Sequence, residues 1–343
     1  MPGAQYKLLR PLLFALPPEA AHQAALAALR LRAALRPLLP PPALPVAAMG
    51  LQFPNPLGLA AGFDKNADSV DALSALGFGF IETGAITPQP QAGNPQPRIF
   101  RLPQAGALIN RMGFNNCGMA AAARHLANRR NRNIIVGVNL GKNAATPLSD
   151  AAGDYCQLLR ALYSGGDFFT LNISSPNTAG LRELEKPDLL QNLLSAVVRE
   201  RDSLARQHGR RAPLAVKLSP DMDAESLAAA AEIIAAENID GVIACNTTQE
   251  RPPEIAALPA ASEKGGLSGA PLTARALAML RDLRKILPAK TAIIGAGGIM
   301  SGEDARARLD AGADLIQIYT GLIYQGPGFP REILRKLQKS ENN

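Results

Sequence analysis

The stretch TAIIGAGGIMSGEDARARLDAGADLIQIYTG, residues 291–321, decides the fold. It opens with the apolar run Thr291–Gly295, passes through a glycine-rich loop into an Ala-rich segment, and closes with a second apolar run, Leu315–Tyr319. Short, continuously apolar runs are typical of parallel strands that are buried on both faces, and the segment between them is long enough for a helix. The stretch therefore predicts a strand–loop–helix–strand unit of a parallel sheet.

The same unit recurs along the chain from about residue 50. Eight runs can be marked: Leu57–Ala61, Phe78–Thr83, Ile134–Asn139, Phe168–Ile173, Leu214–Leu218, Gly241–Cys245, Thr291–Gly295 and Leu315–Tyr319. Eight such units close naturally into a barrel, whereas an open doubly wound sheet rarely uses so many strands at so regular a spacing. We predict the α/β class, with a (β/α)8 TIM barrel over residues 46–343 and an N-terminal helical hairpin extension over residues 1–45.

The first 45 residues differ from the rest of the chain. Residues 4–16 and 18–36 are predicted to form two short helices, separated by Pro17 and Pro18, and the proline-rich piece Pro37–Pro45 is predicted to be a stiff linker. Leu, Phe and Ala fill most positions, and the basic side chains outnumber the acidic ones. Such helices suit a membrane interface, but an ordinary hairpin packed on the barrel is an equal alternative on these residues alone.

The composition excludes several classes of protein. Hydrophobic residues make up 47% of the 343, enough for a large core, and the net charge of +7 is not gathered into the long basic run of a nucleic-acid arm. The three cysteines and three histidines are scattered without zinc or disulfide spacing, so we expect no metal and a reducing compartment. Neither a signal peptide nor a stretch of about 20 apolar residues is visible, so we expect no membrane span.

Polar residues and glycines follow the predicted strands at their C-terminal ends, where such barrels carry their chemistry. They are Asp64, Lys65, Thr83, Asn139, Asn172, Ser175, Asn177, Lys217, Asn246, Thr247, Gly297, Gly298, Tyr319 and Thr320. Side-chain amides offer donors and acceptors together, which suits a planar ligand such as a pyrimidine dione or an isoalloxazine ring. No Cys–His pair or carboxylate cluster is placed for acyl transfer or glycoside hydrolysis.

Glycines after the last two strands predict a phosphate site. Gly295, Gly297, Gly298 and Gly321 would bring backbone N–H groups to the usual phosphate position of these barrels, and FMN is the natural phosphorylated cofactor. No GxGxxG follows a strand, which disfavours a Rossmann dinucleotide site. Lys217 could stabilise an anionic reduced ring, and Lys65 could pair with a substrate carboxylate.

Nine stretches of the body resemble the dihydroorotate dehydrogenase family. They are NPLGLAAGFDKNAD (55–68), INRMGFNNCG (109–118), NLGKN (139–143), NISSPNT (172–178), VKLSPD (216–221), NTT (246–248), GGLSG (265–269), IIGAGGI (293–299) and QIYTGLIY (317–324). Ser175 in NISSPNT resembles class 2, the quinone-dependent, membrane-associated class, whereas the soluble class carries Cys there. The resemblance implies an FMN-dependent oxidoreductase, a flavoprotein of pyrimidine (UMP) biosynthesis that oxidises (S)-dihydroorotate to orotate with a quinone. The alternative is a soluble-class enzyme that uses fumarate or NAD.

The resemblance also implies roles for individual residues. Ser175 is implied as the base that removes the C5 proton, through a relay shaped by Thr178 and Phe114, while the C6 hydride passes to flavin N5. FMN is implied to be held by Ala61, Gly62, Phe63, Asp64, Lys65, Ala85, Asn139, Asn172, Lys217, Cys245, Gly269, Gly298, Tyr319 and Thr320. Orotate is implied to be held by Lys65, Asn110, Arg111, Met112, Gly113, Phe114, Asn172, Asn177, Asn246 and Thr247.

Two positions depart from the family pattern. Ala85 stands where Thr is common, and Cys245 where Thr or Ser is common, so these two FMN contacts are expected to differ.

In class 2 an N-terminal helical pair docks on the membrane and forms the mouth of a quinone tunnel, which residues 1–45 would match. With no transit peptide visible, we expect peripheral attachment to the cytoplasmic face of a bacterial inner membrane, as a monomer or weak dimer.

Overall fold

The structure, a computed structural model, describes residues 3–35 and 40–341. The end of the second predicted helix, Arg36, and the part of the predicted linker up to residue 39 lie outside the described residues. The rest of the chain is described as the following elements.

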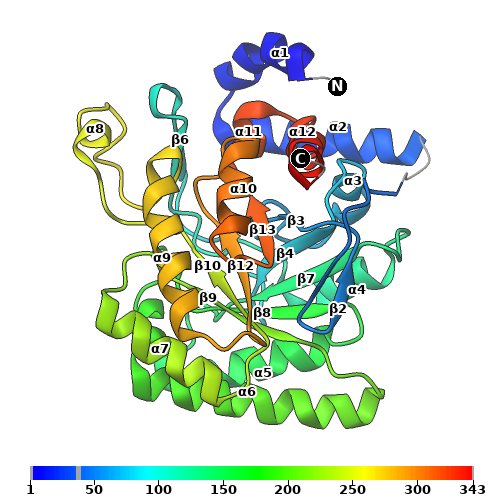
Figure 1. The fold of residues 1–343 in the computed structure, drawn as a ribbon, viewed down its shortest axis with the longest axis vertical. Helices are drawn as coiled ribbons and strands as arrows, with labels where there is room; N and C mark the ends of the chain where they lie inside the picture. Colours follow the sequence, from blue (N-terminus) through cyan, green and yellow to red (C-terminus); the bar gives the residue numbers. More distant parts are fainter. Residues whose placement is uncertain (1–2, 36–39, 342–343) are drawn as a thin grey trace.

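Eight parallel strands close into a barrel in the order β10-β12-β13-β3-β4-β7-β8-β9 (Figure 1). Their bounds are β3 Leu57–Leu59, β4 Phe80–Ile86, β7 Ile135–Leu140, β8 Phe168–Asn172, β9 Leu214–Leu218, β10 Gly241–Ala244, β12 Ala292–Ala296 and β13 Leu315–Ile318. The predicted barrel is confirmed, and every predicted run contains or overlaps one of these strands. Because the barrel strands are almost wholly buried, their continuous apolar runs were readable in the sequence.

Helices follow the strands and cover the outside of the barrel. The longer ones are α4 Gly118–Ala127, α5 Ala151–Leu162, α6 Pro187–His208, α7 Ala224–Ala236, α9 Thr273–Ile286, α10 Gly302–Asp310 and α12 Phe329–Glu341, and the shorter ones are α3 Val70–Ser74, α8 Pro253–Ala256 and α11 Thr320–Gln325. Local capping marks where some of them begin. The side chain of Asp223 accepts from Ser226 N at the start of α7, and that of Ser301 accepts from Asp304 N at the start of α10.

An apolar plug fills the end of the barrel where the strands begin. A short antiparallel hairpin, β1 Val46–Ala48 and β2 Leu51–Phe53, lies there. The Phe53 ring packs edge-on against Phe80 and Phe168, with centroids 5.2 and 6.5 Å apart. This hairpin was not predicted from the sequence. Its packing leaves the opposite end, where the strands finish, for polar side chains.

A second small sheet stands beside the site end of the barrel. It is antiparallel, in the order β11-β6-β5, with bounds β5 Ile99–Leu102, β6 Ala107–Asn110 and β11 Gly266–Gly269. Asn110 lies opposite Gly266 in its register, so the chain brings together segments that are distant in sequence. Local patterns do not reveal such a pairing, and this sheet was also not predicted.

Two N-terminal helices lie over the site end of the barrel. They are α1 Gly3–Ala15 and α2 Pro18–Leu35, close to the predicted ranges, and we call them the N-terminal hairpin. Figure 1 shows them beside α11 and α12. The Tyr6 hydroxyl donates to Ile323 O over 2.6 Å, and Arg10 donates to Tyr324 O over 3.1 Å, so the hairpin is packed on the barrel. Within the described residues, every helix is too short or too polar to span a bilayer.

Candidate active site

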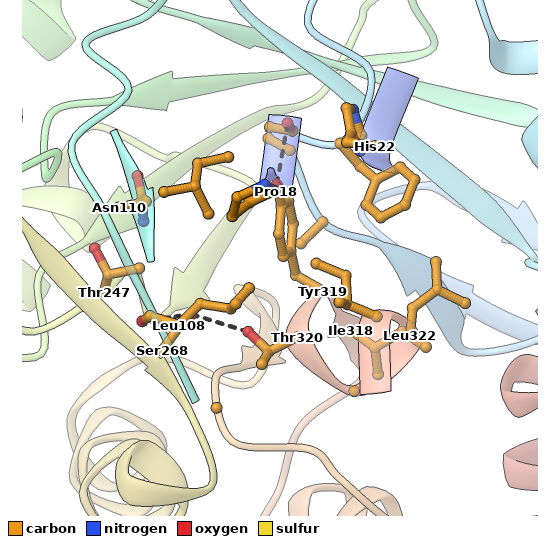
Figure 2. A pocket seen from close by; sticks show the side chains of 18 of the residues that line it. Pro18, His22, Leu108, Asn110, Thr247, Ser268, Ile318, Tyr319, Thr320 and Leu322 are labelled. Carbon is orange, nitrogen blue, oxygen red and sulfur yellow. Dashed lines mark hydrogen bonds between the residues drawn. The ribbon is translucent and has the colours of Figure 1, made fainter. Parts of the chain in front are cut away.

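A cavity of about 510 Å³ lies where the barrel strands end, with the N-terminal hairpin on its outer side. Figure 2 shows Pro18 and His22 of α2 facing the same space as Asn110, Thr247 and Tyr319. The inner part of the cavity is lined by amides, lysines and glycines from the strand ends, and the outer part by Leu, Ala and Phe side chains of α1 and α2. One cavity therefore joins a polar inner end to an apolar mouth.

Three amides lie together at the inner end. Asn172 ends β8, and its Nδ2 donates to Asn139 Oδ1 over 2.9 Å. Asn246 follows β10 and donates to Asn172 Oδ1 over 3.3 Å. Across the cavity, Asn177 Nδ2 donates to Asn110 Oδ1 over 3.2 Å. Because these contacts fix which edge each amide presents, the cavity can distinguish N–H from C=O groups on a planar ligand.

Two lysines reach the same space. In the β8–β9 register Lys217 stands opposite Asn172, and its side chain is buried against the cavity. Lys65 Nζ donates to Gly62 O over 2.5 Å, and burial lowers its pKa to about 8. The Glu19 carboxylate on α2 opposes this shift by its negative charge. Both lysines are placed to hold an anionic ring or carboxylate.

The loops after β12 and β13, together with the end of β11, bring backbone close to the cavity. Gly298 has φ +72°, and a Cβ there would lie 2.4 Å from Thr273 Cα, so only glycine fits. Gly269 has φ +99°, and a Cβ would lie 2.2 Å from Gly106 O. The hydroxyls of Ser268 and Thr320 are 2.9 Å apart. Figure 2 marks this hydrogen bond by a dashed line. The backbone at Gly269 and Gly298 and these two hydroxyls line the same cavity, so together they could hold a phosphate.

Ser175 lies in the loop after β8 and lines the cavity. Its Oγ accepts from Asn177 N over 3.3 Å. Phe114 lines the same cavity, with φ 53°. The Thr178 hydroxyl is buried, and no hydrogen bond to a described residue satisfies it. A buried hydroxyl that no described residue satisfies is available to a bound water.

Most residues that the resemblance implied do line the cavity, but four do not. Asp64 accepts from the backbone N of Asn66, Asp68 and Ser69, so its carboxylate holds the Lys65 loop in shape. The remaining three are Asn139, which lies beneath Asn172, Thr178, which is buried behind the loop, and Arg111. Any part that these four play in ligand binding would therefore be indirect or through the main chain.

Arg111 points away from the cavity. Its guanidinium pairs with Glu263, with Nη1 2.5 Å from Oε2, and stacks on the Phe100 ring at 4.6 Å. Its backbone N also donates to Arg98 O over 2.9 Å. The side chain therefore ties β5 to the loop before β11, whereas Asn110, Met112 and Gly113 on either side of it do line the cavity.

Ala85 and Cys245 both line the cavity, as the family positions suggested. Ala85 offers no side-chain hydrogen bond. Burial raises the pKa of the Cys245 thiol to about 12, so the sulfur stays neutral. Its Sγ lies 4.0 Å from Ala296 O, a weak contact.

Several lining residues were not predicted. His22, Arg101, Ser268 and Gln317 line the cavity, and Glu82 lies beneath it. Burial lowers the pKa of His22 to about 4, so the ring is neutral, and it stands edge-on to Phe63 with centroids 4.8 Å apart. Ser268 and Gln317 lie within the stretches GGLSG and QIYTGLIY that resemble the family, so the sequence could have indicated both as site residues. For His22 and Arg101 no local signal existed. In the described part of the chain, no group of three His, Cys, Asp or Glu residues could hold a metal ion.

Comparison with known proteins agrees with this geometry. The Dihydroorotate dehydrogenase family model matches residues 43–340. Two proteins named dihydroorotate dehydrogenase (quinone) are similar: one from Methylococcus capsulatus is 51% identical, covering 96% of this chain and 97% of the relative, and one from Chromobacterium violaceum is 52% identical, covering 96% of each. A crystal structure of DHODH from Eimeria tenella in complex with ferulenol has a TM-score of 0.88 at 36% identity, covering 96% of this chain and 95% of that one. This chain belongs to the dihydroorotate dehydrogenase family.

Proposed function

We propose that this protein oxidises dihydroorotate to orotate and passes the electrons to a quinone. The observation that carries the proposal is the single cavity, in which a polar end of oriented amides and two lysines opens into an apolar mouth formed by the N-terminal hairpin. A polar, anionic substrate suits the first part, and a hydrophobic electron acceptor suits the second. The relatives that carry the name dihydroorotate dehydrogenase (quinone) support this assignment.

FMN fits the residues at the inner end. The Gly269 and Gly298 backbone, with Tyr319 and Thr320, suits its phosphate, and the Asn172 amide and Lys217 ammonium suit the edge of its ring. The cavity wall also contains a buried acceptor, Gln317 Oε1, for which no described residue supplies a donor. When bound, FMN would accept the two electrons of the oxidation and release them to the quinone.

The remaining steps fall to the side chains of the chain itself. Lys65 would hold the substrate carboxylate, and the amides of Asn110, Asn177 and Asn246 would read the edge of the pyrimidine ring. Ser175 would take the C5 proton, and because a free hydroxyl is a poor base, the proton must move on through a hydrogen-bonded relay. The unsatisfied Thr178 hydroxyl can take part in that relay through a bound water, and the Phe114 ring would exclude bulk water.

The N-terminal hairpin would form the membrane and quinone segment, with residues 46–343 as the catalytic domain. Leu8 and Leu12 of α1 are 80% and 70% exposed, and Leu31 and Leu35 of α2 are 63% and 75% exposed. Leu9 and Leu13, one position along α1, instead line the cavity. Residues four apart share a face of a helix, so α1 has one apolar face toward the cavity and one toward the surroundings.

We infer peripheral attachment to the cytoplasmic face of a bacterial inner membrane, and the exposed leucines support the attachment itself. An interfacial helix can bury its apolar face in the headgroup region without crossing the bilayer. A quinone dissolved in that bilayer could then enter the apolar mouth directly. We infer a monomer or weak dimer, since the hairpin covers the site end of its own barrel.

One spectroscopic experiment tests the proposal. The anaerobic visible spectrum of the purified protein is recorded alone, after dihydroorotate, and after a quinone or fumarate is added. We expect flavin bands that bleach with dihydroorotate and return with the quinone but not with fumarate. A colourless protein, or a flavin indifferent to dihydroorotate, would overturn the proposal, and return with fumarate alone would place the protein in the soluble class.

A further inference from the structure

Glu82, on β4, lies inside the barrel with no exposed surface. Its carboxylate accepts two amide donors, one at each oxygen: Asn139 Nδ2 at 2.7 Å from Oε1, and Gln317 Nε2 at 2.7 Å from Oε2. A carboxylate that meets two amides in this way can only accept. Both amides must therefore turn their NH2 groups toward Glu82 and their oxygens away from it.

One arm of this network runs through the asparagines to the cavity. Asn139 has its Oδ1 free to accept from Asn172 Nδ2, at 2.9 Å, and Asn172 Oδ1 in turn accepts from Asn246 Nδ2, at 3.3 Å. The same Asn246 Nδ2 donates to Ser174 Oγ over 3.0 Å. Each donor–acceptor pair orients the next, so the edges that Asn172 and Asn246 present to the cavity depend on Glu82.

The other arm ends at the cavity wall. Gln317 lines the cavity, and because its NH2 is used by Glu82, its Oε1 is the group left over. That oxygen is buried and accepts no hydrogen bond from the described residues. A buried acceptor without a donor costs free energy, which a ligand N–H would relieve. An N–H group between two carbonyls, as in the imide of an isoalloxazine or a pyrimidine dione, has the matching chemistry.

We propose that Glu82 is a positioning residue, which fixes the orientation of four amides so that the cavity accepts the imide N–H of a bound ring. The proposal rests on the function proposed above and deepens it. A network kept only for stability would be expected to gain nothing from ending at a cavity, since apolar side chains often pack a core as well as buried polar groups do. Two rings could supply the imide, that of FMN or that of the substrate.

The test is Glu82→Gln, which keeps the shape of the side chain. It replaces one of the two accepting oxygens by an NH2 group, which donates. Either Gln317 or Asn139 must then reverse its amide, because two NH2 groups would otherwise face each other. The readouts are the FMN content of the purified protein and the dissociation constant of orotate, taken from the shift that orotate causes in the flavin spectrum. We expect at least one of the two to weaken roughly tenfold or more, as when a buried polar group loses its partner.

Two further variants separate orientation from general damage. Thr170→Val alters another buried side chain of the barrel interior, a β8 hydroxyl that makes no hydrogen bond with any described residue. It should leave both readouts within about twofold of wild type. The double variant E82Q/Q317E returns an acceptor to the position facing the introduced amide. It restores the orientation of Asn139 and keeps an acceptor at the cavity wall, so it should recover most of the loss.

Each outcome decides the matter. Loss in E82Q that the double variant recovers, with T170V unaffected, supports the proposal, and the weakened readout tells which ring supplies the imide. Unchanged FMN content and orotate affinity in E82Q overturn it, as does an equal loss in T170V or a loss that the double variant does not recover. If E82Q alone does not fold, binding by the double variant decides in the same way. Wild-type protein without flavin or orotate response would instead overturn the proposed function.

Discussion

The guanidinium of Arg98 holds the carboxylate of Glu19, with Nε 2.8 Å from Oε1, and so joins the barrel to α2. Arg98 also donates to the main-chain oxygens of Ala92 and Asn94, at 2.7 and 2.9 Å, which fixes it on the barrel side. Arg98 Nη2 also donates to Glu19 Oε2 over 3.1 Å, and Gln96 Nε2 donates to the same oxygen over 3.0 Å. The Arg98 side chain is only 8% exposed, so this pair is partly desolvated and stronger than a surface pair.

Glu19→Gln should therefore loosen the hairpin. We expect a loss of about 1 to 2 kcal/mol in unfolding free energy, because a charge-assisted, partly buried contact becomes a neutral one. The Michaelis constant for quinone should rise, since the mouth of the cavity is built from α1 and α2. Denaturant unfolding and steady-state kinetics measure the two effects. Glu303→Gln, which breaks a surface pair with Lys336, is the control, and an equal effect there would contradict the prediction.

Lys65 should make orotate binding depend on pH. Its pKa is lowered to about 8 by burial, and the charged form binds a carboxylate, so orotate affinity should be level below about pH 8 and fall above it. Titration of the flavin spectrum with orotate from pH 6 to 10 measures this. Lys65→Arg keeps its charge throughout that range, so its affinity, even if weaker, should stay level. A fall at the same pH in both proteins would assign the titration to another group.

His22 should affect stability in acid. The folded-state pKa is lowered to about 4 by burial, below the ordinary value near 6.5, so the unfolded chain takes up the proton first. The stability that the neutral ring contributes is fully present above about pH 6.5 and is lost as the pH falls toward 4. We expect His22 to contribute at most about 3 kcal/mol to the pH dependence of the unfolding free energy. Unfolding of His22→Gln at pH 7 and pH 5 should show a smaller decline than wild type, and parallel declines would refute the assignment.

Ser175→Ala should separate binding from chemistry. The variant keeps the cavity wall, so FMN content and dihydroorotate affinity should stay near wild type. Turnover should fall by a factor of about 10² to 10⁴, as expected when a general base is lost. Anaerobic stopped-flow reduction of the flavin measures the step. Ser149→Ala, which removes a surface hydroxyl bound to Asp150, should behave as wild type. Full turnover by Ser175→Ala would exclude it as the base.

The exposed leucines of α1 should govern membrane binding. Replacing Leu8 and Leu12 by Gln removes apolar side chains from the outer face of the helix, at a cost to partitioning of about 1.5 to 3 kcal/mol for each side chain that is fully buried in the bilayer. Flotation with vesicles of bacterial lipid composition measures the bound fraction. Ile286→Gln on α9 is the matched control, because Ile286 is also exposed, at 38%, but lies outside the hairpin. Unchanged binding of the double variant would contradict a membrane role for this face.

Much of the barrel and part of the site could be predicted from local sequence. Buried strands such as Leu214–Leu218 are apolar along their whole length, so their positions were legible, and the residues after them fell at the site end by the rule of the fold. Lys217, Asn172 and Ser175 were found in this way, and all three line the cavity. The wider assignment of roles came from the resemblance of whole stretches to a family.

The tertiary structure alone decided which side chains face the ligand space and which support it. Asp64 and Arg111 lie in the same motifs as neighbours that line the cavity, yet neither lines it. Asp64 holds a loop and Arg111 braces a small sheet, because the direction of a side chain depends on its contacts with other segments. Glu82 reads in the sequence as an unremarkable acid inside a strand. Only closure of the barrel brings it between Asn139 and Gln317, which are 57 and 235 residues away along the chain, and so gives it partners that no local pattern contains.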